Sequence, residues 1–290
     1  MQRHAVTTLF LVVCLCTCLL ITVRPCTGES FANAATYKRI VSLSPGITEA
    51  LFFLRAEDRV IGVTTYCQKP PRAANKEKIG TIMEINTEKV ISLKPDLVIA
   101  TDLTNSKDIK KLKNLGINVV IFNISKDFKQ LCHVFLDLGK LLGKEEEASS
   151  MIAASKKMII RTQKKVEGLS RKKVFVQLGS KPLFAVTRDY FINDFIEYAG
   201  GKNIFKNAKS GLISREEVVR LNPDIIIITT MGITGEKEQK SWQHYKTINA
   251  VKNNNIYLVD SDRMCSPTPV SFAEFLEEIV KILHPEASKG

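Results

Sequence analysis

The sequence "EKVISLKPDLVIAT", residues 88–101, recurs in nearly the same form as "EEVVRLNPDIIIIT" at residues 216–229, and this repeat indicates the fold. In each copy a short amphipathic segment runs to a proline, which disfavours helical geometry in the residue before it. The run of aliphatic residues that follows is typical of a strand buried on both faces of a parallel sheet. The repeat therefore predicts the same helix and strand in two halves of the chain. The glutamates that open the copies, Glu88 and Glu216, are not needed for that unit.

The segments around both copies alternate between strand and helix patterns, which indicates α/β units. Between the two halves, residues 144–168 contain no proline, and acids come first and lysines later, as the helix dipole favours. This segment predicts one helix of about 35 Å. The fold class is therefore α/β, with two Rossmann-like lobes, each with a central, mainly parallel sheet, joined by one long α-helix. The predicted divisions are a leader at 1–34, an N-terminal lobe at 35–143, the inter-lobe helix at 144–168 and a C-terminal lobe at 169–290.

The leader carries the pattern of an export signal: Arg3 and His4, then an apolar run at residues 5–23, then Ala32-Asn33-Ala34 as a cleavage site. The apolar run is close to the ~20 residues that span a bilayer, so an uncleaved anchor is the alternative. Arg24 and Pro25 are poor neighbours for lipid attachment at Cys26. Each alternative places the folded part in the periplasm or at the outer face of the cytoplasmic membrane.

Composition and motifs exclude several function classes. The formal charge is +12, but the lysines are spread along helices without interleaved aromatics, so nucleic acid is not an expected partner. No G-x-G-x-x-G, P-loop or G-x-S-x-G motif is present, and the histidines outside the leader are His133, His244 and His284. Such scattered histidines favour neither an enzyme nor a metal site, and no cofactor is expected.

The chain resembles the helical-backbone periplasmic substrate-binding proteins that feed ABC importers for cobalamin, ferric siderophores and haem. The matching stretches follow the family's order over nearly all of the chain after the leader: "RIVSLSPGITEALFFL", "DRVIGVTTYCQKPP", "INTEKVISLKPDLVIA", "LGINVVIFN", "VFVQLGSKPLFAV", "YAGGKNIF", "SREEVVRLNPDIIII" and "PVSFAEFLEEIVKILHPE". "SLSP", "TTYC" followed by "PP", and "SREEV" are most similar to the cobalamin-binding members.

The resemblance implies a function without catalysis. The protein would act as a monomer that captures cobalamin or a related corrinoid and delivers it to an ABC importer permease dimer with its ATPase subunits. A haem or ferric-siderophore binding protein of the same family, or a membrane-tethered ligand-sensing domain, is the alternative. The family docks on its permease through one glutamate from each lobe, and the matching positions here are Glu88 and Glu216. A carboxylate favoured by the dipole at a helix start is the structural alternative for each of them.

The ligand of a two-lobed binder lies between the lobes, at the carboxyl ends of the strands. The loops at those ends, which the family uses too, predict these cleft residues: Ser44, Pro45, Tyr66, Cys67, Ile82, Met83, Thr101 and Asp102 in the first lobe, and Ser180, Lys181, Leu183, Asp262, Arg263 and Met264 in the second. Met231 and Gly232 belong to the same set of loops.

Several of these side chains have more than one expected role. Tyr66 either stacks on a planar ring of the ligand, which we favour, or is a core tyrosine whose hydroxyl is hydrogen-bonded. Cys67 either contacts a metal carried by the ligand, is a buried inert thiol, or bridges to Cys265 across the mouth. Asp262 and Arg263 either bond polar groups of the ligand or pair with each other.

Two features depart from the cobalamin-binding pattern. Those proteins carry several cleft tryptophans, whereas this chain has only Trp242, expected in a surface loop of the second lobe. In "CSPTPV", Ser266 and Val270 stand where the family tends to have arginines.

Overall fold

The computed structural model describes residues 37–229 and 235–288, which all belong to one compact unit. The predicted leader at 1–34 and the cleft residues Met231 and Gly232 lie outside the described residues. Within the described ranges, no helix combines the length and the apolar composition that a bilayer crossing requires.

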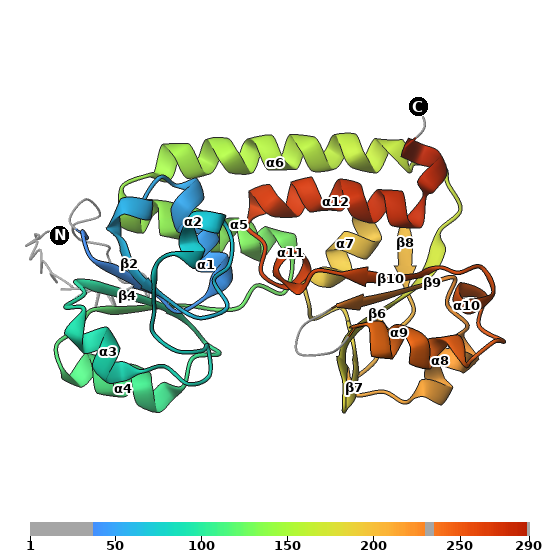
Figure 1. Ribbon diagram of the computed structural model, residues 1–290. Coiled ribbons are helices and arrows are strands. Elements are labelled where there is room, and N and C mark those ends of the chain that lie inside the picture. Colours follow the sequence, from blue (N-terminus) through green and yellow to red (C-terminus); the bar gives the residue numbers. More distant parts are fainter. Residues whose placement is uncertain (1–36, 230–234, 289–290) are drawn as a thin grey trace, which may run out of the picture. The chain divides into compact units, whose positions relative to one another are not determined.

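The first lobe is built on a sheet of five parallel strands in the order β3-β2-β1-β4-β5 (Figure 1). Its strands are β1 (Ile40–Ser42), β2 (Val60–Val63), β3 (Glu77–Lys78), β4 (Leu97–Thr101) and β5 (Val119–Phe122). Its helices are α1 (Pro45–Phe53), η1 (Glu57–Arg59), α2 (Pro71–Ala74), α3 (Thr87–Ser92), α4 (Ser106–Asn114) and α5 (Phe128–Leu142). The sequence signals lie at the helix ends: Pro45 stands in the first turn of α1, and Gly143 ends α5 in the left-handed conformation.

The second lobe has a sheet in the order β10-β9-β6-β7, and β8 also pairs with β6. All pairs are parallel except β6 with β7, a hairpin that the sequence did not predict. Its strands are β6 (Lys172–Ser180), β7 (Leu183–Ala185), β8 (Gly201–Asn203), β9 (Ile225–Thr229) and β10 (Ile256–Val259). Its helices are α7 (Ile192–Tyr198), α8 (Arg215–Leu221), α9 (Gly235–Gln243), α10 (Asn249–Lys252), α11 (Ser261–Cys265), α12 (Pro269–Leu283) and η2 (Pro285–Ser288).

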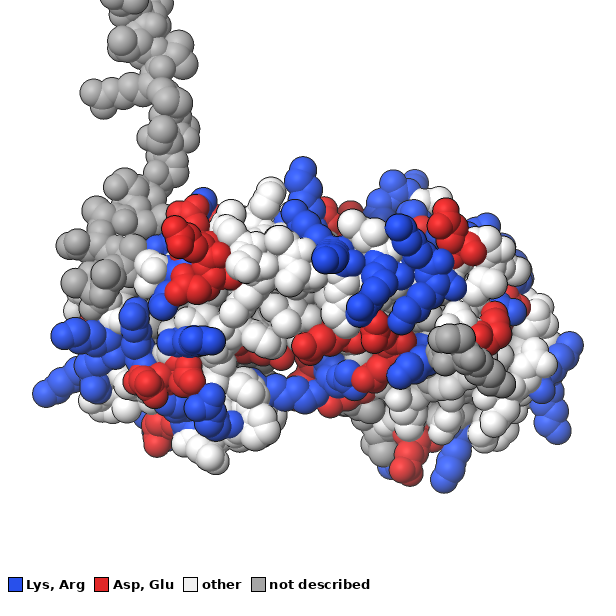
Figure 2. All heavy atoms as spheres, turned by 90° about the horizontal axis from the view of Figure 1, so that it is seen from above, with Lys and Arg blue, Asp and Glu red and all other residues white. Residues whose placement is uncertain are grey.

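One helix, α6 (Glu145–Lys165), joins the two lobes, as the charge pattern predicted. Glu145, Glu146 and Glu147 occupy its first turn, and Lys164 and Lys165 its last, so both ends are stabilised by the helix dipole. Figure 2 views this side of the molecule, where basic side chains are spread over both ends and acidic side chains lie among them. The predicted fold class of two α/β lobes and one connecting helix is confirmed. The domain boundaries remain predictions.

The repeated strands are buried on both faces, and their alternation divides the core into three clusters. In β4, Leu97 and Ile99 face a large shared cluster, while Val98 faces a second cluster under α3 and α4, called the outer cluster of lobe one. In β9, Ile225 and Ile227 face the same shared cluster. Ile226 and Ile228 face a third cluster under α8 and α9, called the outer cluster of lobe two.

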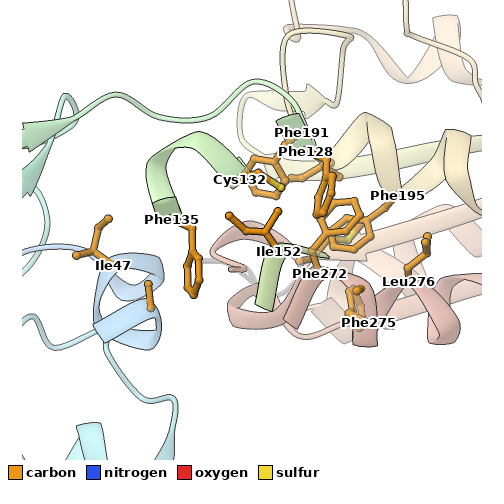
Figure 3. Packing of buried hydrophobic residues seen from close by; sticks show 14 of the residues in the cluster. Ile47, Phe128, Cys132, Phe135, Ile152, Phe191, Phe195, Phe272, Phe275 and Leu276 are labelled. Carbon is orange, nitrogen blue, oxygen red and sulfur yellow. The ribbon is translucent and has the colours of Figure 1, made fainter. Parts of the chain in front are cut away.

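The shared cluster continues from one lobe into the other (Figure 3). Phe272 of α12 lies at its centre, with ring centroids 3.9 Å from Phe195 of α7 and 4.8 Å from Phe128 of α5. Ile152 of α6 packs in the same cluster. Because α5 belongs to lobe one and α7 to lobe two, the lobes have one aromatic core in common. This core holds the site described next between two fixed walls.

Candidate functional site

A cavity of about 140 Å³ lies where the carboxyl ends of the lobe-one strands meet the start of α12. Lobe one contributes the turn after β1, with Ser44 and Pro45, and the segment 122–125 after β5. Lobe two contributes Phe191 and the segment 265–269 between α11 and α12. The wall is mainly apolar with a few hydroxyl groups, as in sites for bulky organic ligands. Drug-sized ligands need roughly 300–1,000 Å³, so this cavity admits only part of a large ligand.

Gly46 sets the closest approach of the lobes beside this cavity. A Cβ atom on Gly46 would lie 3.1 Å from the main-chain carbonyl oxygen of Ser266, tighter than ordinary contact. Glycine at this position therefore lets the β1–α1 turn touch the lobe-two segment. The contact places the hydroxyl-bearing Ser44 and Thr268 on opposite walls of one cavity.

A half-buried carboxylate, that of Glu49, connects lobe one to the start of α12. Glu49 of α1 accepts a hydrogen bond of 2.7 Å from the Ser271 hydroxyl and one of 3.3 Å from the Thr268 N–H. Thr268 and Ser271 also form the capping box at the start of α12. Burial raises the pKa of the Glu49 carboxyl, although the bonds from Ser271 and Thr268 partly offset that rise. Lobe one thus supplies an extra cap to a lobe-two helix.

A second polar contact between the lobes involves Lys69 and Asp260. The Lys69 Nζ atom lies 2.8 Å from Asp260 Oδ2. Partial burial acts to raise the pKa of Asp260, but the bonds from Lys69 and from the Asp262 N–H hold it below its usual value. Burial, together with the Asp260 charge, raises the pKa of Asp262.

Four predicted cleft residues, Ser44, Pro45, Ile82 and Thr101, line the cavity. Asp102 follows Thr101 but is exposed, and its Oδ1 accepts the Ile124 N–H, which orients the β5–α5 segment. The predicted side chains Tyr66 and Met83 are 55% and 64% exposed and lie outside the cavity wall. Their role in the cleft therefore remains a prediction.

The structure places the two cleft cysteines differently from each other. Cys67 is fully buried, and its Sγ lies 3.2 Å from the Thr48 hydroxyl and 3.1 Å from that of Thr64. This arrangement fits the inert-thiol alternative and leaves the sulfur without access to a ligand. Cys265 lines the cavity and is a free thiol like Cys67, so the two form no bridge. Burial raises the pKa of Cys265 to about 12, which keeps the thiol protonated at neutral pH.

The lobe-two cleft residues lie outside the cavity wall. Ser180, Lys181 and Leu183 belong to the β6–β7 hairpin; Lys181 is exposed, and Leu183 packs in the outer cluster of lobe two. Met264 is fully buried in the shared cluster.

Arg263 pairs with Glu278 of α12 through both of its terminal nitrogens, and its guanidinium lies 4.6 Å from the Phe275 ring centroid. The expected pairing of Arg263 with Asp262 is therefore wrong, because Glu278 presents both oxygens to the guanidinium and Phe275 presents its face.

The two family docking positions occupy matching places. Glu88 lies in the first turn of α3, after the Asn86 cap, and Glu216 lies in the first turn of α8, after the Ser214 cap. Both carboxylates are exposed. The Glu216 N–H and then the Ser214 hydroxyl lower the pKa of the Glu216 carboxyl, which keeps it ionised. Each lobe thus presents an exposed glutamate at the same position of the helix that its sequence repeat encodes.

Trp242 is buried in α9, so its expected place in a surface loop is wrong. Its Nε1 donates a 2.7 Å bond to Gln177 Oε1, and the Arg215 guanidinium lies 4.4 Å from its ring centroid. The polar neighbours of Trp242 in the sequence suggested exposure. The partner that buries its N–H, Gln177, comes from β6, about 65 residues away in sequence.

Sequence reasoning missed three contributors to the site: the segment 122–125, the segment 266–269 and Glu49. The carboxyl-end rule, applied to the β5 strand as it was to its neighbours, would have found the first. Glu49 lies within a helix and carries no loop signal, so nothing local in the sequence marked it. No cluster of three or more metal-ligating side chains occurs in the described part of the chain.

Comparison with known proteins places this geometry in a family. The periplasmic binding protein family matches residues 40–263. A Bacillus subtilis protein, an uncharacterised ABC transporter substrate-binding lipoprotein, is 34% identical over 260 residues, which is 87% of this chain and 82% of the relative. The vitamin B12-binding protein of Vibrio parahaemolyticus is 25% identical over 249 residues, 83% of this chain and 87% of the relative.

A solved structure shows the same architecture. The crystal structure of a possible iron-binding periplasmic solute-binding protein from Staphylococcus epidermidis aligns with a TM-score of 0.75 at 30% identity. The alignment covers 86% of this chain and 99% of that structure.

Proposed function

Because the chain belongs to the periplasmic binding protein family, we propose that it captures cobalamin or a related corrinoid at the inter-lobe cavity and hands it to an importer. Its class is that of ABC-transporter substrate-binding proteins for cobalamin, siderophores or haem. Such proteins are not enzymes, and what they bind is the transported ligand. Cobalamin as that ligand is the part that we propose.

The observation that carries this proposal is the position and chemistry of the cavity. It opens at the carboxyl ends of the lobe-one strands, has apolar walls and offers the hydroxyls of Ser44 and Thr268. A ligand with a large apolar body and amide side chains satisfies both features, since one edge or side chain enters the cavity while the body lies across the exposed mouth. We propose that the ring of Tyr66, which is exposed, stacks on a planar face of the bound ligand.

The vitamin B12-binding relative supports the same ligand class. The second candidate is a ferric chelate, which the 30% identity to the possible iron-binding protein favours. The described residues hold no group of three metal-ligating side chains. In either case the metal would therefore arrive already held by an organic chelator. Haem remains a member of the same alternative, and a membrane-tethered sensing domain would use the same cavity without a permease.

We propose Glu88 and Glu216 as the contacts to the permease dimer. Both are exposed, both begin a helix of the repeated unit, and each lies in a different lobe. A two-fold symmetric partner that offers an arginine to each carboxylate would form two oriented, charge-assisted pairs. The dipole at a helix start explains one glutamate as well as the other, but it does not explain why both copies of the repeat open on the same residue type.

The deciding experiment is titration of the purified protein with cyanocobalamin, haemin and a ferric siderophore, followed by absorbance and calorimetry. We expect saturable one-to-one binding of cyanocobalamin. Binding of the ferric siderophore or of haemin alone would refute the corrinoid proposal while leaving the transport class intact. Ser44→Ala with Thr268→Val removes two of the cavity hydroxyls with little change in side-chain volume. If their bonds hold ligand amides, affinity falls about 10-fold or more.

The exported location is also proposed. The apolar run at residues 5–23 and the lipoprotein relative support a protein held at the outer face of the cytoplasmic membrane or free in the periplasm. N-terminal sequencing of the purified protein tests it: a start after Ala34 indicates cleavage, and a start at Met1 indicates an anchor.

A further inference from the structure

Helix α4 of lobe one carries an exposed basic surface. Its nine residues contain four lysines and one aspartate, which gives the helix a net charge of +3. Lys107 and Lys110 line one shallow hollow with Leu115, and Lys113 lines a neighbouring hollow with Ile121 of β5. Leu115 and Ile121 are 56% and 43% exposed. These five residues are called the α4 surface below.

The lysines of the α4 surface have no internal role in the described structure. Among residues 37–229 and 235–288, no carboxylate lies within ion-pair distance of Lys107, Lys110 or Lys113, whereas lysines such as Lys69 and Lys144 do have acidic partners. Three uncompensated cations that flank exposed aliphatic side chains do not stabilise the fold. This combination of lysines and aliphatic groups is what binds at the interface of an anionic bilayer.

The second lobe provides an internal comparison. Its corresponding helix, α9, also has nine residues and follows the second copy of the buried strand, but it contains two lysines and two glutamates. One of those glutamates, Glu238, is engaged by Arg215 at 2.7 Å. The fold unit therefore does not require a basic helix at this position, and the charge of α4 is specific to lobe one.

The position of α4 brings it close to two points that face a membrane in the proposed function. At one point, the Lys111 side chain donates a 2.8 Å hydrogen bond to the hydroxyl of Thr87, which is the neighbour of Glu88. Figure 1 shows α3 and α4 together below the lobe-one sheet. A permease that receives Glu88 would therefore bring the surrounding lipid toward α4.

The second point is the entry of the chain from its first 36 residues. The Tyr37 hydroxyl accepts a 2.7 Å hydrogen bond from Asn118, which lies between α4 and β5. The described chain thus begins beside the end of α4, and the apolar run at residues 5–23 is joined to it there by a short stretch. An anchor in those residues would hold this same edge near the bilayer.

We propose that the α4 surface binds the anionic headgroups of the membrane that contains the permease, with Leu115 and Ile121 entering the interfacial layer. The orientation rests on the docking role of Glu88, whereas the lipid contact itself is independent of that role. Lipid binding on one lobe, added to carboxylate docking on both, would hold the protein at the membrane surface before it meets a permease.

The test measures partitioning of the purified, exported protein onto vesicles that contain either phosphatidylcholine alone or phosphatidylcholine with phosphatidylglycerol. The test variant carries Lys107→Gln, Lys110→Gln and Lys113→Gln. Its matched control carries Lys156→Gln, Lys157→Gln and Lys164→Gln, which remove the same charge from the exposed side of α6. Hydrogen exchange of residues 106–122 reports contact at the α4 surface itself, whether or not the exported protein retains an anchor.

We expect the unmodified protein to prefer anionic vesicles, and the preference to weaken as salt shortens the Debye length. Each lysine near an anionic surface contributes about 1 kcal/mol of attraction. Loss of three lysines should therefore lower the partition coefficient of the α4 variant roughly 100-fold, and that of the α6 control far less. Exchange in residues 106–122 should slow on anionic vesicles only. Equal losses in both variants would show a net-charge effect and overturn the proposal.

Two further outcomes separate this inference from the docking role. Glu88→Ala with Glu216→Ala should leave vesicle binding unchanged, so the lipid contact can stand even if docking fails. Should the α4 variant impair uptake while its vesicle binding is unaltered, the lysines contact an acidic protein surface, and the lipid proposal is wrong.

Discussion

The two outer clusters show how differently the lobes support the same repeated unit. Under α3 and α4, the outer cluster of lobe one is aliphatic throughout, with Val90, Val98 and Leu112 among its buried members. Under α8 and α9, the outer cluster of lobe two is built around Trp242 and Phe175, whose ring centroids are 5.5 Å apart. The repeated strand has nearly the same sequence in both lobes, but the side chains that pack against it differ.

The two lobes also differ in their hydrogen bonds beside the outer clusters. In lobe two, Gln177 accepts from the indole N–H of Trp242 and donates to Glu238 at 2.8 Å, and Arg215 donates to the same Glu238 oxygen. These contacts among Gln177, Trp242, Glu238 and Arg215 are called the polar ring of lobe two below. The buried members of the lobe-one outer cluster are all aliphatic, so the polar ring has no counterpart among them. The duplicated pattern therefore specifies the backbone path and the exposed glutamate, while each lobe fills its own interior independently.

The strongest test of the likeness between the lobes is the double substitution Glu88→Ala with Glu216→Ala. If both carboxylates meet arginines, uptake through the importer should fall at least 100-fold, because each lost pair leaves a charge unpaired at the interface. Ligand affinity should stay the same, since both residues lie on helices away from the cavity. Unchanged uptake would contradict the docking role. Single substitutions with similar losses would show that the lobes are equivalent to the permease.

A second test asks whether the lobes unfold separately. Leu112→Ala leaves a cavity in the outer cluster of lobe one and should cost about 2–5 kcal/mol, and Phe272→Ala in the shared cluster about 3–5 kcal/mol. Trp242 is the only tryptophan in the chain, so its fluorescence in urea reports on lobe two. If the lobes unfold together, Leu112→Ala should lower the urea concentration at the unfolding midpoint by the same amount whether unfolding is followed by Trp242 fluorescence or by circular dichroism. A fluorescence midpoint that does not move would mean independent lobes.

The polar ring of lobe two gives a third, smaller effect. Gln177→Leu would strand the buried indole N–H of Trp242 and remove one donor from Glu238, at a cost of roughly 1–3 kcal/mol. Urea unfolding followed by fluorescence measures this cost. The matched control is Gln243→Leu, at an exposed position of α9, the helix that carries Trp242, which should change stability by less than about 0.5 kcal/mol. Equal behaviour of the two variants would show that the ring adds no stability.

The smallest effect concerns the pH dependence of the inter-lobe contact at Glu49. Burial raises the pKa of Glu49 in the folded protein, so the folded state binds this proton more tightly than the unfolded chain. Stability from this group is therefore present below the ordinary pKa and lost as pH rises through the raised pKa. Glu49→Gln should be more stable than the original protein at neutral pH, and the advantage should disappear toward the ordinary carboxyl pKa.

Thermal unfolding between pH 4 and pH 8 measures this difference, and the melting temperature of Glu49→Gln should exceed that of the original protein by an amount that grows as the pH rises. Glu167→Gln, at an exposed position after α6, is the control for net charge. An advantage of Glu49→Gln that is constant with pH would mean that burial of the charge is not its cause.

The sequence predicted the backbone architecture well because its signals are local. Prolines 95 and 223 end helices, glycine 143 caps one, and the charge order along 144–168 indicates a single helix. Each of these signals determines the backbone conformation of residues close to it in the sequence. The hairpin of β6 and β7 was missed because Leu183–Ala185 is a short edge strand without a pattern of its own.

The candidate site was predicted only in part, for a different physical reason. Ser44, Pro45, Ile82 and Thr101 line the cavity, as the carboxyl ends of strands suggest. The burial of Cys67 depends on Thr48 and Thr64, and the role of Arg263 depends on Glu278 in another helix. Contacts between distant segments decide which way such side chains turn, and no local pattern records them.

The shared aromatic core also determines when the molecule can complete its folding. Glu49 and Ser271, which join across it, are 222 residues apart in sequence. Ile47 and Phe135 belong to the same hydrophobic cluster as Phe275 and Leu276 of α12, a helix close to the end of the chain. Contacts of such long range form late. A chain that emerges amino-terminus first, from a ribosome or a translocation pore, therefore keeps its apolar helices uncovered until α12 arrives, which leaves it open to chaperones throughout its synthesis or passage.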